Sequence, residues 1–130
     1  MILDKKSILS ADDVVKELVS VPEWGGEVYV RGMTGAARDK FEASIVQTKG
    51  KDQTVNMTNL RAKLASFTIC DEQGQRLFTD ADIVELSNKS ASALQRVFIV
   101  AQRLSGIGED EVKELAEGLE ENPLEDSASD

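Results

Sequence analysis

The fold of this chain is decided by the stretch Val21-Pro22-Glu23-Trp24-Gly25-Gly26-Glu27-Val28-Tyr29-Val30-Arg31-Gly32-Met33-Thr34. Pro22 fixes its own φ and lacks an N–H group, and the Gly25-Gly26 pair permits positive φ. The chain is therefore expected to reverse direction here, between two runs that favour β structure. The pattern predicts an antiparallel hairpin over residues 14–33.

The two predicted strands differ in how clearly they alternate. The run 14–21 is rich in β-branched residues and places three valines on one side of an extended chain: Val15, Val19 and Val21. The run 27–33 alternates strictly, so that Val28 and Val30 are expected to face the core. Before the hairpin, a short polar segment offers Ser10 and Asp13 as a capping pair for one turn of helix.

Two amphipathic helices are predicted after the hairpin. Thr34 is the expected N-cap of the first, over residues 35–46, and a polar loop at 49–53 follows it. The second covers about 57–69 and ends at a turn over 71–76. Each carries an apolar stripe at helical spacing, formed by Ala37, Phe41 and Ile45 in the first and by Leu60, Leu64 and Phe67 in the second.

Capping signals predict the remaining helices. Thr79 and Asp82 form a capping box that opens a short helix with Ile83 and Leu86 inside. Ser90 caps the most hydrophobic segment, 91–104, whose apolar residues cover much of its circumference and place it in the middle of the core. That helix is expected to terminate at the Gly106-Ile107-Gly108 stretch, whose glycines suit a helix end.

The C-terminal region is strongly acidic. The chain has 24 acidic and 15 basic residues, and residues 109–130 carry ten of the acids but only Lys113 among the bases, so the whole net charge of −9 lies there. An acidic helix is predicted to end near residue 119, and 120–130 is predicted to be a disordered tail that either keeps the protein soluble or folds on a partner. We therefore expect an α+β fold: one domain over 1–119, with about five helices.

Composition excludes several kinds of function. The chain has no histidine and only Cys70, so it lacks the commonest general base and metal ligand and cannot form an intrachain disulfide. Asp71 and Asp82 are explained by a turn and a cap, and Cys70 is expected to be a small buried side chain. We predict no enzyme activity and no catalytic, cofactor or metal site. Binding to nucleic acid, membranes or small-molecule substrates is not expected, and the protein should reside in the cytosol.

The candidate partner-binding residues lie in the hairpin and the tail. Trp24, at the turn, has two interpretations: it packs over the edge of the core, or it is exposed as an anchor for a partner. The other candidates are Tyr29, Arg31, Glu120, Glu121, Glu125 and Asp126.

A resemblance to a known family rests on ordered matches over most of the chain. Residues 22–42 resemble the PEWGG-x-V-x-V-R-x-hydrophobic-T-G-x-x-R-D-x-F-E signature of tail assembly chaperones from long-tailed phages and prophages, especially those of actinobacterial hosts. Further matches, in order up to about Gly106, are Ile8-Leu9-Ser10, residues 71–82, Ala93–Phe98 and Arg103–Gly106.

The resemblance implies a non-enzymatic assembly factor of the host cytoplasm that is absent from the finished tail. Such chaperones are thought to coat the tape measure protein, keep it soluble and help recruit tail tube subunits; self-association is also possible. In many relatives, a ribosomal frameshift yields a longer form. Two alternatives are a structural tail or neck protein of the virion and an acidic DNA mimic that inhibits host proteins, although the crowding of the carboxylates at one end disfavours the mimic.

Overall fold

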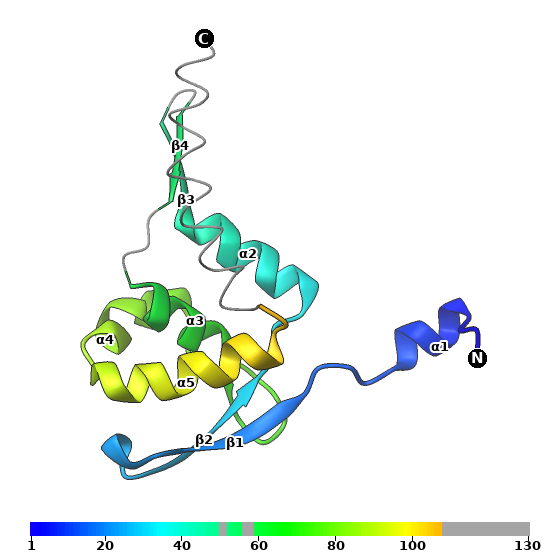
Figure 1. Cartoon of the computed structure of the whole chain (residues 1–130), viewed down its shortest axis with the longest axis horizontal. Coiled ribbons are helices and arrows are strands. Elements are labelled where there is room, and N and C mark those ends of the chain that lie inside the picture. The colour runs from blue at the N-terminus through cyan, green and yellow to red at the C-terminus, as the bar shows by residue number, and fades with distance from the viewer. Residues whose placement is uncertain (50–51, 56–58, 108–130) are drawn as a thin grey trace.

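The computed structural model describes residues 1–49, 52–55 and 59–107. This part of the chain contains five α-helices, a three-stranded antiparallel sheet and a separate two-stranded sheet (Figure 1). The predicted α+β class, mostly helical with an N-terminal hairpin, is confirmed. The predicted acidic helix, the domain limit at residue 119 and the predicted disordered tail lie outside the described residues.

The hairpin consists of β1 (Lys16–Val21) and β2 (Gly26–Arg31), joined by the 3₁₀ turn η1 (Pro22–Trp24). Gly25 follows η1 with a φ of 78°, the left-handed conformation that the sequence predicted for this turn. In the hairpin register Leu18 lies opposite Tyr29. The short strand β5 (Ile69–Cys70) pairs with the other edge of β2, so the sheet order is β1-β2-β5.

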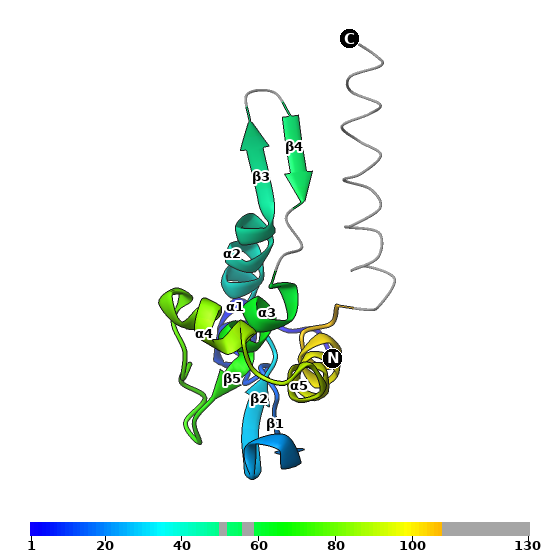
Figure 2. The same cartoon turned by 90° about the vertical axis from the view of Figure 1, so that its left-hand side faces the viewer.

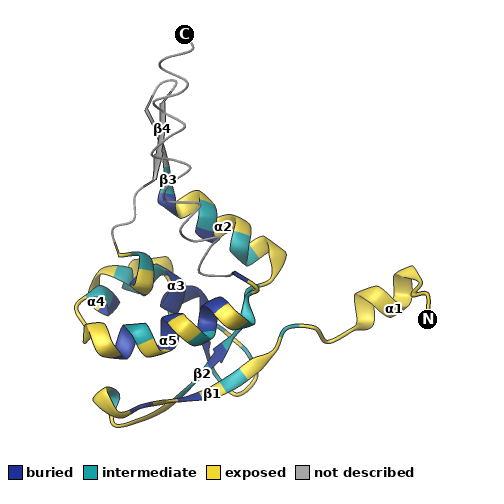
Figure 3. Cartoon of the chain, viewed as in Figure 1, coloured by how far each residue is buried: buried dark blue, intermediate teal, exposed yellow. Residues whose placement is uncertain are grey.

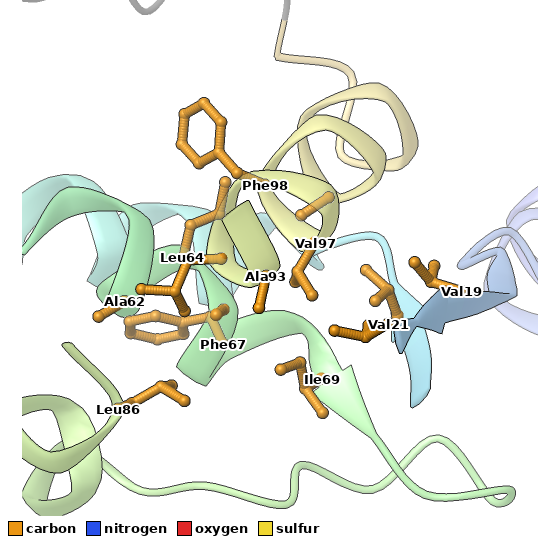
Figure 4. Packing of buried hydrophobic residues seen from close by; sticks show 14 of the residues in the cluster. Val19, Val21, Ala62, Leu64, Phe67, Ile69, Leu86, Ala93, Val97 and Phe98 are labelled. Atoms are coloured by element: carbon orange, nitrogen blue, oxygen red, sulfur yellow. The ribbon is translucent and has the colours of Figure 1, made fainter. Parts of the chain in front are cut away.

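One face of this sheet packs against α3 (Leu60–Thr68) and α5 (Ala91–Leu104) (Figures 1 and 4). Val19, Val21 and Val30 on the sheet are buried there, and Val28 packs against the same core. The prediction that Val15 shares this face is wrong, because Val15 precedes β1 and is 57% exposed.

Helix α2 (Gly35–Ile45) starts where it was predicted: Thr34 Oγ1 accepts a hydrogen bond of 3.1 Å from the Ala37 N–H. Phe41 and Ile45 are buried, and the Phe41 ring meets the Phe67 ring edge-on, with 6.0 Å between centroids. The prediction of a polar loop after this helix is wrong. Strands β3 (Val46–Lys49) and β4 (Asp52–Val55) pair there as a second antiparallel hairpin, which projects from the end of α2 (Figure 2).

Helix α3 is shorter than predicted, because Ile69 leaves the helix to join the sheet as β5. The predicted start at Met57 lies outside the described residues. Leu64 and Phe67 are buried as their spacing indicated. Buried residues concentrate in α3, in α5 (Ala91–Leu104) and in the sheet (Figure 3).

The turn over 71–76 and the capping box are confirmed. The Asp71 carboxylate accepts hydrogen bonds from the N–H groups of Gln73 and Gln75, at 2.9 and 2.8 Å. Thr79 and Asp82 cap each other's backbone at the start of η2 (Asp80–Asp82), which continues into α4 (Ile83–Ser87).

Helix α5 is capped by Ser90 and is followed by Gly106 with a φ of 72°, which confirms the predicted helix end. The predicted position in the core is confirmed for one face of the helix, and the expectation that apolar burial covers much of its circumference is wrong. The helix contacts α3 and the β1–β2 hairpin, burying Leu94, Val97 and Phe98, while Ile99 is 54% exposed. The helix therefore carries more apolar residues than the fold buries.

Helix α1 (Lys5–Ser10) begins earlier than the capping pair Ser10 and Asp13 predicted, so that prediction is wrong. Asp4 caps it instead, accepting a hydrogen bond of 2.9 Å from the Ser7 N–H, while the Ser10 hydroxyl donates to the Ser7 carbonyl. Helix α1 is exposed along its whole length and stands away from the body (Figures 1 and 3).

Candidate functional site

The fold separates the three candidate residues of the hairpin. Tyr29 and Arg31 lie on the sheet face that points away from α3 and α5, whereas Trp24 lies in η1, at the far end of the hairpin. The four candidate residues of the tail, Glu120, Glu121, Glu125 and Asp126, lie outside the described residues. Two surfaces therefore need description.

The first surface, which we call the outer sheet face, consists of Lys16, Leu18, Tyr29 and Arg31. Leu18 is 48% exposed opposite the half-buried Tyr29, and Lys16 Nζ lies 4.6 Å from the centroid of the Tyr29 ring. The same ammonium donates to the Glu72 carbonyl oxygen. The face thus has an apolar centre with cations at one end.

Arg31 is held less completely than Lys16. Its Nε is buried without a hydrogen-bond partner among the described residues. The side chain borders a depression of about 530 Å³ between β1 and the 71–76 turn, whose other walls include Lys16 and Gln75. Arg31 therefore places a positive charge beside an open, polar hollow.

Cys70 lies opposite Tyr29 in the register, on β5. It is buried, and burial raises the pKa of its thiol. The positive charges of Arg31 and Lys16 lower this pKa, but by less. A thiol with a raised pKa is a poor nucleophile, so the structure agrees with the small buried side chain that the sequence predicted.

The second surface, which we call the Trp24 groove, is a depression of about 470 Å³ between η1 and α4. Its apolar wall comes from Trp24, Phe78 and Leu86. Trp24 is half-buried and packs against the hydrophobic core, as the first of its two interpretations predicted, yet it also lines this open groove. Its indole Nε1 is buried and has no acceptor within the part of the chain that the structure describes.

The rim of the Trp24 groove is acidic. Glu23, Asp82 and Glu85 line it against a single cation, Lys89. Glu23 also forms an ion pair of 2.9 Å with Arg96 on α5. A hydrogen bond from its own backbone N–H, together with Arg96, holds the pKa of Glu23 below its ordinary value, and desolvation opposes this shift. Glu23 therefore stays ionised under neutral conditions.

Metal-binding clusters and membrane-spanning helices are both absent from the described residues. Across the described residues, no three Cys, Asp or Glu side chains gather in a way that could hold a metal ion. None of the described helices is long and apolar enough to cross a membrane.

Sequence reasoning missed Leu18 and Phe78 as surface residues, whereas Leu86, predicted to lie inside, is only 5% exposed and still borders the groove. A signal existed for Leu18, since it alternates with Val19 along β1 and must therefore face away from the core. Phe78 and Leu86 meet Trp24 only through tertiary packing, more than fifty residues along the chain, and no local pattern joins them.

The family of this chain follows from comparison with known proteins. A family model described as phage tail assembly chaperone matches residues 4–117. The chain belongs to this family. A tail assembly chaperone is an assembly factor with a non-enzymatic role, and phage tail proteins are its general class of partner.

A solved structure resembles this tail assembly chaperone in fold. The tail assembly chaperone of bacteriophage HK97 superposes with a TM-score of 0.54 over 76% of this chain and 90% of that one, at 20% sequence identity. At that identity the likeness concerns the fold. No curated protein matches the chain.

Proposed function

We propose that this tail assembly chaperone binds the tape measure protein of its phage, keeps it soluble and helps recruit tail tube subunits. It acts in the host cytoplasm and is absent from the mature virion. The family match over residues 4–117 is the observation that carries the proposal. A tape measure protein presents long apolar helical stripes before the tube encloses them, so its chaperone needs an apolar surface that releases when tube subunits compete.

The outer sheet face suits that contact. Leu18 and Tyr29 form an adjacent apolar pair on a sheet face that no helix covers in the described part of the chain. In Figure 1 helices α3, α4 and α5 all lie on the other side of the hairpin. An amphipathic helix could pack its apolar stripe on Leu18 and Tyr29, while Arg31 pairs with an acidic side chain of that helix.

The acidic C-terminal residues have a second role in the proposal. Glu120, Glu121, Glu125 and Asp126 limit aggregation of the complex or pair with basic helices of the partner. Deleting residues 120–130 should lower the soluble fraction of coexpressed tape measure protein. Unchanged solubility and unchanged tube assembly would remove this role.

The test of the sheet contact is coexpression of the full chain with a fragment of the tape measure protein. Leu18→Asp places a charge in the apolar centre and should reduce both the soluble fraction and copurification of the fragment. The matched control is Ile99→Asp, since Ile99 is similarly exposed at 54% but lies on α5. Equal loss in both variants would contradict the proposed surface. Finding the chain in purified virions would favour a structural tail or neck protein instead.

A further inference from the structure

The N-terminal arm, residues 1–10, carries apolar side chains that none of the other described residues covers. Helix α1 buries no residue, and the large apolar residues of the arm are all exposed: Met1, Ile2, Leu3, Ile8 and Leu9. The helix is nonetheless a formed element, capped by Asp4 at 2.9 Å. A preformed helix with uncovered apolar residues is typical of a segment that docks on a partner surface.

The charges of the arm indicate which surface of the protein it can bind. Lys5, Lys6 and Leu9 line one side of α1 together, so its exposed apolar surface is flanked by two cations. The outer sheet face is also cationic, through Lys16 and Arg31. The rim of the Trp24 groove carries the opposite charge, from Glu23, Asp82 and Glu85. Its apolar wall could receive Leu9. Complementary charge therefore favours the groove.

The geometry of the chain disfavours docking of the arm into its own groove. Helix α1 ends at Ser10 and β1 begins at Lys16, so five residues join them. Fully extended, they span about 17 Å, whereas the six residues of β1 alone, which separate this linker from the turn η1, span about 20 Å. Helix α1 and the turn η1 also lie on opposite sides of the body (Figure 1). A second copy of the chain faces no such limit.

We propose that the N-terminal arm of one copy docks into the Trp24 groove of another copy. Leu9 and its apolar neighbours contact Trp24, Phe78 and Leu86, while Lys5 and Lys6 lie against the acidic rim. Because arm and groove are different patches, the contact gives a reciprocal dimer or a longer head-to-tail assembly. This inference is independent of tape measure binding, which we assigned to the outer sheet face.

The test uses the full chain and two readouts, sedimentation over a wide concentration range and the emission of Trp24. Trp24 is the only tryptophan in the sequence and it lines the groove, so its emission reports on docking directly. We expect concentration-dependent association, with an emission change at the same concentrations. Leu9→Asp should weaken association at least about tenfold, because it places a charge in an apolar contact.

Charge reversal identifies the partner surface. Glu85→Lys should weaken association, as should Lys5→Glu with Lys6→Glu, and a mixture of the two variants should associate more strongly than either alone. Glu85 and both lysines are exposed, so these changes leave the core intact. The controls are Lys40→Glu on α2 and Ile99→Asp on α5, also exposed, which should associate like the wild type.

Four results would overturn the inference. A chain that stays monomeric at all concentrations has no exchange of arms. A monomer whose Trp24 emission changes with Leu9→Asp has its arm in its own groove. An assembly that resists both Leu9→Asp and Glu85→Lys is held by another surface. Loss of tape measure binding in the Glu85→Lys variant alone would assign the groove to the tape measure protein. Failure of the Leu18→Asp test leaves these outcomes unaffected.

Discussion

Gly32 lies directly against the backbone of Leu104, where β2 leaves the sheet and α5 ends. A Cβ atom on Gly32 would overlap the Leu104 carbonyl oxygen and lie 3.0 Å from its carbonyl carbon. The next residue continues the junction, since the Met33 N–H donates to Ser105 Oγ at 3.0 Å. Only glycine lets the hairpin and α5 approach this closely, so this junction fixes how the sheet meets its main helix.

Gly32→Ala should therefore destabilise the fold by about 1–3 kcal/mol, the usual cost of forcing extra volume into a close contact. The obstacle is backbone, which cannot rotate away as a side chain could. The free energy of unfolding from chemical denaturation measures the effect. Gly26→Ala, at the other end of β2, is the matched control, because a Cβ atom there would meet nothing within 4 Å and the stability of this variant should change little. Equal costs in both variants would contradict the close approach.

Arg76 holds the segment after β5 against α3. Its Nε donates to the Ser66 carbonyl at 2.6 Å, one Nη donates to Ser66 Oγ, and the guanidinium lies 4.3 Å from the centroid of the Phe67 ring. Arg76→Lys keeps the charge but loses the planar fork and its stacking. We expect a loss of about 1–3 kcal/mol, partly because the Ser66 carbonyl loses its guanidinium donor.

Asp80→Asn is the control for Arg76→Lys. Asp80 forms an ion pair of 2.9 Å with Arg76, and the Asp80 side chain is 77% exposed. Such a pair contributes about 0–1 kcal/mol, so this variant should cost clearly less. Thermal unfolding of both variants measures the difference. If Asp80→Asn costs as much as Arg76→Lys, the ion pair rather than the contact with Ser66 holds the segment.

Elements with local signals could be predicted from the sequence. The hairpin turn depends on Pro22 and Gly25, and the starts of α2 and α5 depend on Thr34 and Ser90, so each is fixed within a few residues. The hairpin β3–β4 was missed because its strands pair with each other and not with the core, so no apolar run marks them. The available signal was the pair of four-residue segments with β-branched residues on either side of Gly50.

The surfaces were harder to predict than the elements. Tyr29 and Arg31 were correctly placed on one strand, but Trp24 faces a different surface because the 3₁₀ turn carries it toward α4. Phe78 and Leu86 join it only once β5 and α4 are packed. Similarly, the exposure of α1 and of Ile99 depends on which elements are near them, which periodicity alone cannot reveal.

The cap of α5 gives a third prediction. Ser90 Oγ accepts a hydrogen bond of 3.3 Å from the Ala93 N–H at the start of the helix. Ser90→Ala leaves that N–H without its side-chain acceptor and should cost about 1 kcal/mol. Ser92→Ala is the control within the first turn, where an exposed serine becomes a better helix former and stability should hold or rise slightly. Chemical denaturation compares them, and equal loss in both would argue against the cap.

The lowered pKa of Glu23, caused first by a hydrogen bond from its own backbone N–H and then by Arg96, predicts a pH dependence of stability. The pKa of Glu23 is held below its ordinary value of 4.5 in the folded chain, so the folded state binds its proton less tightly than the unfolded state does. The stabilisation is therefore present above the ordinary value and is lost as the pH falls through the lowered pKa. Glu23→Gln should be less stable than the wild type at neutral pH, and the difference should shrink in acid.

Chemical denaturation followed by circular dichroism at about pH 7 and about pH 3.5 measures this difference in the free energy of unfolding. The control is Glu27→Gln in β2, whose carboxylate is exposed and forms no ion pair with any described side chain. That variant should track the wild type at both pH values. If the deficit of Glu23→Gln persisted unchanged in acid, the charge on Glu23 would not be its cause.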